Sequence, residues 1–131
     1  MAQANPVADS DEEVQHPMSD PEPSVKHIVF FITTASAEEG ERIARSLLEE
    51  RLAACVNIVP AVRSFFWWEG KVQAEAEVLL VVKTQAALFE ALAARVRSLH
   101  SYTVPEIIAL PVTAGNPAYL GWVRESVRPA G

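Results

Sequence analysis

The sequence predicts an α/β fold of the α+β type, a sandwich of one antiparallel sheet, two long helices and a short C-terminal helix. Short apolar runs and helical patterns follow one another in the order strand, helix, strand, strand, helix, strand, helix. The two middle strands are separated by Glu69-Gly70, which suits a hairpin turn because glycine adopts a positive φ. Half of the residues are hydrophobic, so this chain of 131 residues can bury the core of one domain.

The first strand is expected at residues 26–33 and the first helix directly after it. Residues 28–32 are apolar at every position, which is typical of a strand covered on both faces. Ser36 and Glu39 have the spacing of a capping box, in which each side chain bonds a backbone N–H of the first turn. The helix should run to about Leu52, and its apolar positions share one face: Ile43, Ala44, Leu47 and Leu48.

Residues 55–66 and 71–83 are expected to form a hairpin whose two ends differ. From Val72 to Val78 apolar and polar residues alternate, whereas residues 78–82 are all apolar. The first strand leads into an aromatic run at residues 65–68. One end of the hairpin should therefore have one solvent-exposed face, and the other end should be covered on both faces.

The second long helix is expected to begin at Thr84 as its N-cap, with a buried face made of Leu88, Leu92, Val96 and Leu99. A short loop then leads to a strand at residues 106–112. Asn116 followed by Pro117 predicts the start of the short C-terminal helix, because Asn caps well and Pro suits the first helical position.

This order of elements predicts a ferredoxin-like βαββαβ sandwich, built from two right-handed crossovers joined by the hairpin. Both long helices should then lie on one face of the sheet and leave the other face bare. A bare face should alternate polar and apolar residues, yet residues 28–32, 78–82 and 107–110 are apolar at successive positions. We therefore expect another copy of the chain to cover that face, with the aromatic hairpin tip as an arm that grips the neighbour.

The negative charge of the chain is concentrated at its N-terminus. Residues 1–24 carry six acidic side chains and no basic one, whereas the remaining residues carry 11 of each, so the net charge of −6 belongs to this segment. A segment this polar buries too little apolar surface to offset its ordering entropy, so we expect a disordered acidic tail at 1–24 and one domain at 25–131. A neutral domain without a basic stripe argues against nucleic-acid binding.

Composition also bears on cellular location. No apolar run approaches the roughly 20 residues that span a bilayer, and the N-terminus has no basic region followed by an apolar stretch. The single cysteine cannot form an intrachain disulfide. We therefore expect no membrane contact and a cytoplasmic protein.

Four spaced motifs resemble the CutA family of divalent-cation tolerance proteins. They are residues 52–58 (LAACVNI), the hairpin around 68–71 (WEGK), the loop 100–106 (HSYTVPE) and residues 119–122 (YLGW), and the resemblance covers about 28–125. It implies a ferredoxin-like homotrimer similar to the P-II signalling proteins, associated with metal-ion tolerance and copper binding and with no established enzymatic reaction. The chain departs from the family pattern at Ser101, where a Pro is usual, and at Phe66, where a Tyr is usual.

Three side chains are candidate metal ligands, namely His100, Cys55 and Glu106, since imidazole and thiolate suit copper and zinc and a carboxylate adds a hard donor. Each also has a structural alternative. His100 can cap the second helix, Cys55 can be a small buried hydrophobe, and Glu106 can be the polar start of a strand. We expect weak binding of Cu(II) or another divalent metal, dominated by His100, and no metal requirement for folding.

The aromatic residues are expected either to pack in the trimer interface or to line a ligand cleft between subunits. They are Phe65, Phe66, Trp67, Trp68, Tyr102 and Trp122.

The fold alone does not choose among functions. A metallochaperone needs a Cys-x-x-Cys loop, but residues 33–36 contain no Cys, and the third strand lacks the basic-aromatic signature of RNA-recognition domains. No nucleophile-base pair or glycine-rich phosphate loop suggests an enzyme. Two hypotheses stay open. One is a trimer that binds a divalent metal. The other is a P-II-like trimer that senses a small organic ligand or docks on an unidentified partner protein.

Overall fold

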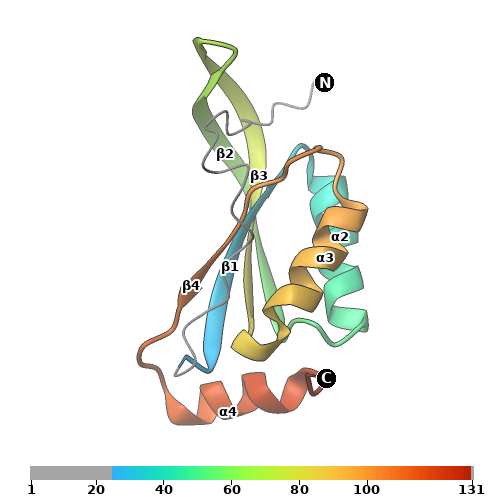
Figure 1. The fold of residues 1–131 in the computed structure, drawn as a ribbon, viewed down its shortest axis with the longest axis vertical. Coiled ribbons are helices and arrows are strands. Elements are labelled where there is room, and N and C mark those ends of the chain that lie inside the picture. The colour runs from blue at the N-terminus through green and yellow to red at the C-terminus, as the bar shows by residue number, and fades with distance from the viewer. Residues whose placement is uncertain (1–24, 131) are drawn as a thin grey trace.

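The structure, a computed structural model, describes residues 25–130, and the predicted acidic tail lies outside this part (Figure 1). The elements follow one another as β1 (His27–Thr34), α2 (Ala37–Glu49), β2 (Cys55–Trp68), β3 (Lys71–Gln85), the 3₁₀ turn η1 (Ala86–Leu88), α3 (Phe89–Leu99), β4 (Ile107–Pro111) and α4 (Pro117–Ser126). The four strands form one antiparallel sheet in the order β2-β3-β1-β4, with α2 and α3 on one face and α4 across one end. The predicted α+β fold is confirmed.

The core lies between the sheet and the helices α2 and α3. Every second residue of β1 faces the helices, and Ile28, Phe30 and Ile32 are at most 1% exposed. Leu80 and Val82 of β3 lie opposite Ile32 and Phe30 and are equally buried. The Phe30 ring stacks on Phe89 of α3 with ring centroids 5.5 Å apart. Each of these side chains stabilises the fold by about 1.5–3 kcal/mol through burial.

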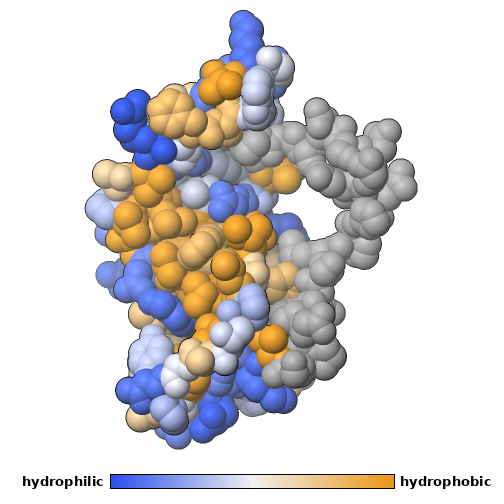
Figure 2. Space-filling model, turned by 90° about the vertical axis from the view of Figure 1, so that its left-hand side faces the viewer, coloured by the Kyte–Doolittle hydropathy of each residue, from blue (hydrophilic) through white to orange (hydrophobic). Residues whose placement is uncertain are grey.

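The other face of the sheet carries no helix. We call it the helix-free face and define it by the residues that alternate with the core positions: Val29, Phe31, Leu79, Val81, Ile108 and Leu110. Directly paired residues of antiparallel strands share a face, and Ile108 pairs with Phe31 while Leu110 pairs with Val29. Figure 2 shows a large hydrophobic patch on this side of the molecule. Ile108 is 50% exposed there and Leu110 is 42% exposed.

Two of the three predicted helix N-caps, Ser36 and Asn116, are present. The Ser36 hydroxyl accepts the backbone N–H of Glu39 at 3.1 Å, and the Glu39 carboxylate accepts the N–H of Ala35 at 3.2 Å. The carboxylate therefore reaches one residue further back than the capping box predicts. At α4 the Asn116 side chain accepts the N–H of Ala118 at 3.0 Å, and Pro117 occupies the first turn.

The prediction of a helix N-cap at Thr84 is wrong. Strand β3 continues through Thr84 to Gln85, because Thr84 still pairs with Ile28 of β1. The buried Thr84 hydroxyl donates to the Leu52 carbonyl at 2.6 Å. Pairing with the whole length of β1 thus outweighs the capping preference, and α3 begins only at Phe89, after the turn η1.

The distal part of the hairpin, residues 62–77, projects beyond the body of the protein, and we call it the arm (Figure 1). It stands alone because β1 ends at Thr34, opposite Val78, so that β2 and β3 pair only with each other beyond this point. Glu69 (φ 53°) and Gly70 (φ 79°) turn the chain, as the sequence predicts. Across residues 25–130, no helix has the length and apolar character needed to cross a membrane.

Candidate functional site

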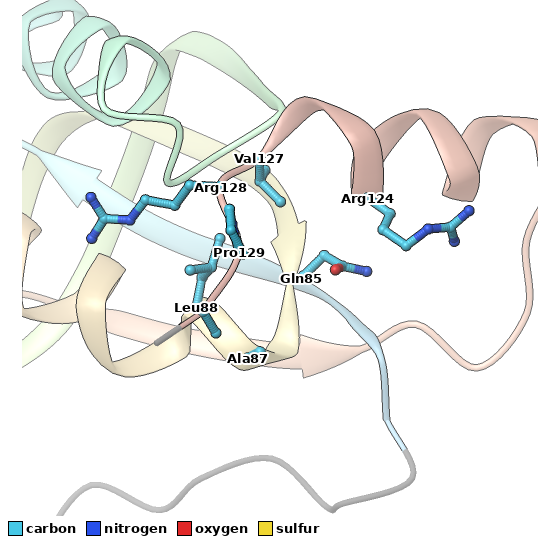
Figure 3. A pocket seen from close by; sticks show the side chains of 8 residues that line it. Gln85, Ala87, Leu88, Arg124, Val127, Arg128 and Pro129 are labelled. Atoms are coloured by element: carbon cyan, nitrogen blue, oxygen red, sulfur yellow. The ribbon is translucent and has the colours of Figure 1, made fainter.

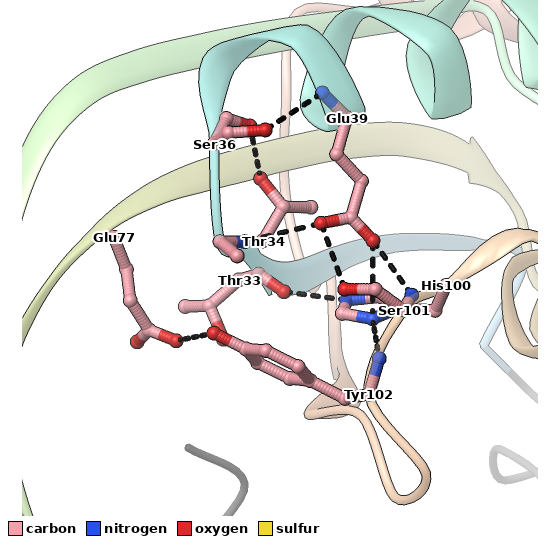
Figure 4. Close-up of polar contacts among 9 residues, drawn as sticks. Thr33, Thr34, Ser36, Glu39, Glu77, His100, Ser101 and Tyr102 are labelled. Carbon is pink, nitrogen blue, oxygen red and sulfur yellow. Dashed lines mark hydrogen bonds and ion pairs between the residues drawn. The ribbon is translucent and has the colours of Figure 1, made fainter. Parts of the chain in front are cut away.

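Polar side chains gather where β1 ends, under the loop that follows α3 (Figure 4). We call this group the β1-end cluster. It draws on β1, α2, β3 and the loop between α3 and β4, and its members are Thr33, Glu39, Glu77, His100, Ser101, Tyr102 and Glu106. Four of the ionisable members are largely withdrawn from solvent: Glu39, Glu77, His100 and Tyr102. Buried polar groups need partners, so the hydrogen bonds define what this cluster can do.

The His100 imidazole uses both of its ring nitrogens within the protein. Nε2 lies 2.7 Å from the Thr33 carbonyl oxygen, and Nδ1 accepts the backbone N–H of Tyr102 at 3.0 Å. A carbonyl only accepts, so Nε2 carries a proton. His100 thus fastens the loop after α3 to the end of β1. It bonds no carbonyl of its own helix through the ring, and a metal ion has to displace one of these two partners to reach it.

Glu39 is a buried carboxylate that is held ionised. Its oxygens accept the Ser101 backbone N–H at 2.7 Å, the Ser101 hydroxyl at 3.1 Å and the Ala35 N–H at 3.2 Å. Burial alone would raise the pKa of Glu39, but the bonds from Ser101, the nearby His100 and the bond from Ala35 together lower it below 4.5. Ser101 therefore anchors the loop after α3 to α2 through both its backbone N–H and its hydroxyl.

Tyr102 and two further carboxylates complete the cluster. The Tyr102 hydroxyl donates to Glu77 at 2.6 Å, and burial together with this bond raises the pKa of Tyr102. Burial raises the pKa of Glu106 as well, and repulsion from Glu77 adds to this, although a hydrogen bond from Thr33 opposes it. Glu106 still reaches solvent. Among the cluster's carboxylates it is the one open to a proton or a cation from outside.

Cys55 does not belong to this cluster. It pairs with Lys83 of β3, which pairs with Val29 of β1, four residues from Thr33. Four residues of a strand span about 13 Å. The Cys55 side chain is half-buried on the helix-free face, where Lys83 Nζ and Asn57 Oδ1 each lie 3.9 Å from its sulfur. The structure therefore brings Glu106 and His100 into one region and leaves Cys55 apart, outside the core.

The predicted aromatic set also divides. Along the arm the side chains alternate, so that Phe65 (65% exposed) and Trp67 (69% exposed) face one side, while Phe66 and Trp68 are half-buried on the other. Tyr102 is buried in the β1-end cluster. Trp122 is exposed on α4 beside Tyr119, with ring centroids 5.5 Å apart. Within one chain these rings do not meet in a single cleft.

Sequence reasoning missed four members of the cluster as site residues: Thr33, Glu39, Glu77 and Ser101. Glu39 was visible only as a cap, and Glu77 only as one polar residue of an alternating stretch. Both become site residues because β1 ends at Thr34 and the loop after α3 fills the space beyond it. No local pattern in the sequence predicts that the loop after α3 contacts Glu39 and Glu77.

Similar sequences are known from plants and bacteria. The chain is 50% identical over 105 residues to protein CutA 1, chloroplastic, of Oryza sativa, which covers 80% of this chain and 59% of the relative. It is 53% identical over 98 residues to the divalent-cation tolerance protein CutA of Thermus thermophilus, which covers 75% of this chain and 95% of the relative. The chain thus spans about three fifths of the plant relative and nearly all of the bacterial one.

Solved structures of the same kind share the fold. The crystal structure of CutA1 from Oryza sativa matches with a TM-score of 0.79 at 50% identity, over 81% of this chain and 97% of that chain. The divalent cation tolerance protein from Thermus thermophilus matches with a TM-score of 0.76 at 51% identity, over 78% of this chain and 99% of that chain.

The prediction of a cytoplasmic location is wrong. The relatives from Oryza sativa and Arabidopsis thaliana are called chloroplastic, and the similar structure from Archaeoglobus fulgidus is called periplasmic. The prediction rested on composition alone, and a folded domain of this composition serves in more than one compartment.

The family comparison agrees with the motifs in the sequence. The model of the CutA1 divalent ion tolerance protein matches residues 28–126, from the first buried position of β1 to the last residue of α4. This range includes all four motifs that resemble the family and every strand and helix of the fold. The chain therefore belongs to the CutA1 divalent ion tolerance protein family.

Proposed function

We propose that this protein serves divalent-cation tolerance without catalysing a reaction, as a homotrimer that binds a divalent ion such as Cu(II) weakly near its subunit borders. The observation that carries the proposal is the helix-free face. It presents contiguous apolar side chains over β1, β3 and β4, and the described part of the chain leaves it open. An exposed apolar patch of this kind marks an interaction surface.

The arm supports assembly with further copies of the chain. Phe65 and Trp67 share one side of the arm with Val72 and Ala74, their cross-strand partners. Three of these four side chains are large, apolar and exposed. Aromatic residues are enriched in interface cores, and an arm that projects from one subunit naturally reaches its neighbour. In a ring, each subunit uses one surface to hold the next and another to be held, which closes the assembly.

The metal part of the proposal is limited by the donors. Within residues 25–130 of one chain, no three His, Cys, Asp or Glu side chains are arranged to hold a metal ion. Glu106 is the accessible donor, whereas His100 has to release Thr33 or Tyr102 first. Cys55 lies elsewhere on the sheet. A site made from Glu106, a released His100 and water is open, and open sites bind less tightly than closed four-ligand sites.

The engagement of His100 favours the second function, a P-II-like sensor of a small organic ligand or a docking protein for a partner. Such a sensor needs no soft ligand, so it leaves the two His100 hydrogen bonds intact. The arm's half-buried rings, Phe66 and Trp68, would then offer stacking surface to a ligand held between subunits.

Light scattering combined with calorimetric copper titration tests both parts. The native protein should give about three times the chain mass of 14.3 kDa and should bind Cu(II) weakly. Glu106→Gln and His100→Ala should each reduce copper binding, whereas Cys55→Ser should retain it. A monomer mass contradicts the assembly. Trimers that bind no copper favour the sensor, and copper binding unchanged in both Glu106→Gln and His100→Ala contradicts the site.

A further inference from the structure

A pocket of about 300 Å³ lies at the end of the sheet opposite the arm, between α4 and the turn η1 (Figure 3). Its walls are mostly apolar, and they include Ala87 and Leu88 of η1 and Val127 and Pro129, which follow α4. Gln85 adds one neutral polar group. The pocket is remote from the β1-end cluster, because Gln85 lies opposite His27, at the other end of β1.

Two arginines give the pocket a positive character. Arg124 and Arg128 both line it, no acidic residue does, and the two side chains extend to opposite sides in Figure 3. Arg95 on α3 has a carboxylate partner, with its Nη2 2.9 Å from Glu50 Oε2. In residues 25–130, Arg124 and Arg128 have none. The pocket therefore offers two separated guanidinium groups and an apolar floor between them.

The chain enters the described part of the structure beside this pocket. The Ala86 N–H, between the pocket residues Gln85 and Ala87, donates to the Lys26 carbonyl at 2.8 Å. Val25 packs against the core. The segment that precedes Val25 therefore joins the described part of the chain close to the mouth of the pocket.

The segment that precedes Val25 has the complementary charge. Residues 1–24 carry all of the net charge of −6, and their last acidic pair stands in the sequence Asp20-Pro21-Glu22-Pro23. Asp20 is five residues from Val25, a stretch of chain that spans at most about 17 Å. Two carboxylates separated by proline match two guanidinium groups separated by an apolar floor, since Arg pairs well with carboxylates and proline packs on apolar surface.

We propose that the acidic N-terminal segment of this chain binds the pocket between α4 and η1. Asp20 and Glu22 pair with Arg124 and Arg128, and the prolines between them cover the apolar floor. The contact is independent of metal binding and of the helix-free face. It is electrostatic in the main, so salt at about 0.5 M, where the Debye length is far below 10 Å, weakens it.

Paramagnetic relaxation in the full-length protein tests the contact. A nitroxide is attached after Ser19→Cys in a Cys55→Ser background, and broadening of the amide signals of Val127, Arg128 and Ala130 is measured at low salt. We expect strong broadening in the native pocket and a reduction of several-fold in Arg124→Gln/Arg128→Gln. The matched control, Arg42→Gln/Arg45→Gln on α2, removes two other arginines without a carboxylate partner in residues 25–130 and should leave the broadening unchanged.

Variants of the segment locate the contact within it. Asp20→Asn/Glu22→Gln should lose the broadening, and Asp9→Asn/Asp11→Asn should keep it. Equal broadening in the native and Arg124→Gln/Arg128→Gln proteins, or none in either, overturns the proposal. If low millimolar citrate abolishes the broadening while an equal ionic strength of sodium chloride does not, free carboxylates are the better occupants, and the assignment to this segment falls.

Discussion

The two faces of the sheet are built from the same strands, yet their side chains are buried to different extents within one chain. On the helix-covered face, Phe30 and Leu80 are fully buried. Their immediate neighbours Phe31 and Leu79, on the helix-free face, are only half-buried although they are equally apolar. Hydrophobicity alone therefore does not determine burial in one subunit. The face with helices holds the fold together, and the proposed assembly would cover the face without helices.

The sharpest test of this comparison uses adjacent residues of β3. Leu80 is fully buried against the helices, whereas Val81 lies on the helix-free face. Leu80→Ala should destabilise the fold by about 2–5 kcal/mol, because it removes transfer free energy and leaves a cavity. This loss should not depend on protein concentration. Val81→Ala should act through assembly, so its loss should grow as the protein is diluted.

Chemical denaturation at several protein concentrations measures both variants. A cost of Val81→Ala that is the same at every concentration contradicts an interface on the helix-free face.

A charge on the same face should prevent assembly while preserving the subunit. Ile108 is half exposed on the edge strand β4, so Ile108→Asp removes no core contact. In an apolar interface the new carboxylate is desolvated without a partner. We expect the mass in light scattering to fall from about three times 14.3 kDa toward the chain mass, with the far-ultraviolet circular dichroism retained. Glu69→Asp at the arm's turn, a change without new charge, serves as the control. A trimer mass for Ile108→Asp would show that another surface assembles the protein.

Much of the fold could be predicted because its signals are local. Ser36, Asn116 and Gly70 mark two helix starts and a turn, and the structure has all three. Thr84 shows where local reasoning fails, since a good cap lies inside a strand when the neighbouring strand is long enough to pair with it. The predicted bare face also follows from strand pattern and crossover handedness, and neither needs tertiary detail.

The site was less predictable because it depends on which segments meet. The sequence suggested two roles for His100, a helix cap or a metal ligand. In the structure His100 is the C-cap residue of α3, with its backbone N–H donating to the Val96 carbonyl, while its ring joins Thr33 to Tyr102. Residues 33, 39 and 77 are far from 100–106 in sequence, and no local pattern reports that they converge. Alternation along a strand is a local property, by contrast, and it accounts for the exposure of Phe65 and Trp67 on one side of the arm.

The pH dependence of stability distinguishes the buried carboxylate of Glu39 from the solvent-accessible carboxylate of Glu106. Glu39→Gln should destabilise the protein by about 1–3 kcal/mol at pH 7, because buried donors such as the Ser101 N–H lose a charged acceptor. The folded pKa of Glu39 lies below the unfolded value of 4.5, so its contribution is complete above pH 4.5 and disappears as pH falls through the folded pKa. The difference in melting temperature between native and variant should therefore shrink below pH 4.5.

Glu106→Gln is the matched control with the opposite sign. The folded pKa of Glu106 lies above 4.5, so folding favours its protonated form, and the native protein is at a disadvantage above that pKa. The variant should be at least as stable as the native protein at pH 7, and the two should converge as pH falls below 4.5. A Glu39→Gln difference that is constant from pH 3 to 7 would contradict the ionised anchor.

The smallest expected effects come from one substitution made at two glycines, one in the arm and one in α4. Gly70 has φ 79° and no heavy atom near an added Cβ, so Gly70→Ala meets only backbone strain and should destabilise the native protein by about 1 kcal/mol. Gly121 is inside α4, and an added Cβ there meets Arg124 Nη2 at an ordinary 3.5 Å. Gly121→Ala should therefore stabilise the protein by about 0.5–1 kcal/mol through helix propensity.

Denaturation midpoints of the two variants measure these opposite shifts. Because a Cβ added at Gly70 meets no heavy atom within 4 Å in residues 25–130, the loss in Gly70→Ala should appear only to the extent that the arm is held in the assembly. The Ile108→Asp background, in which we expect single subunits, should therefore reduce the Gly70→Ala loss and leave the Gly121→Ala gain unchanged. If the Gly70→Ala loss is the same in both backgrounds, the turn strain is felt by the isolated subunit, and the arm is then part of the fold rather than part of the contact between copies.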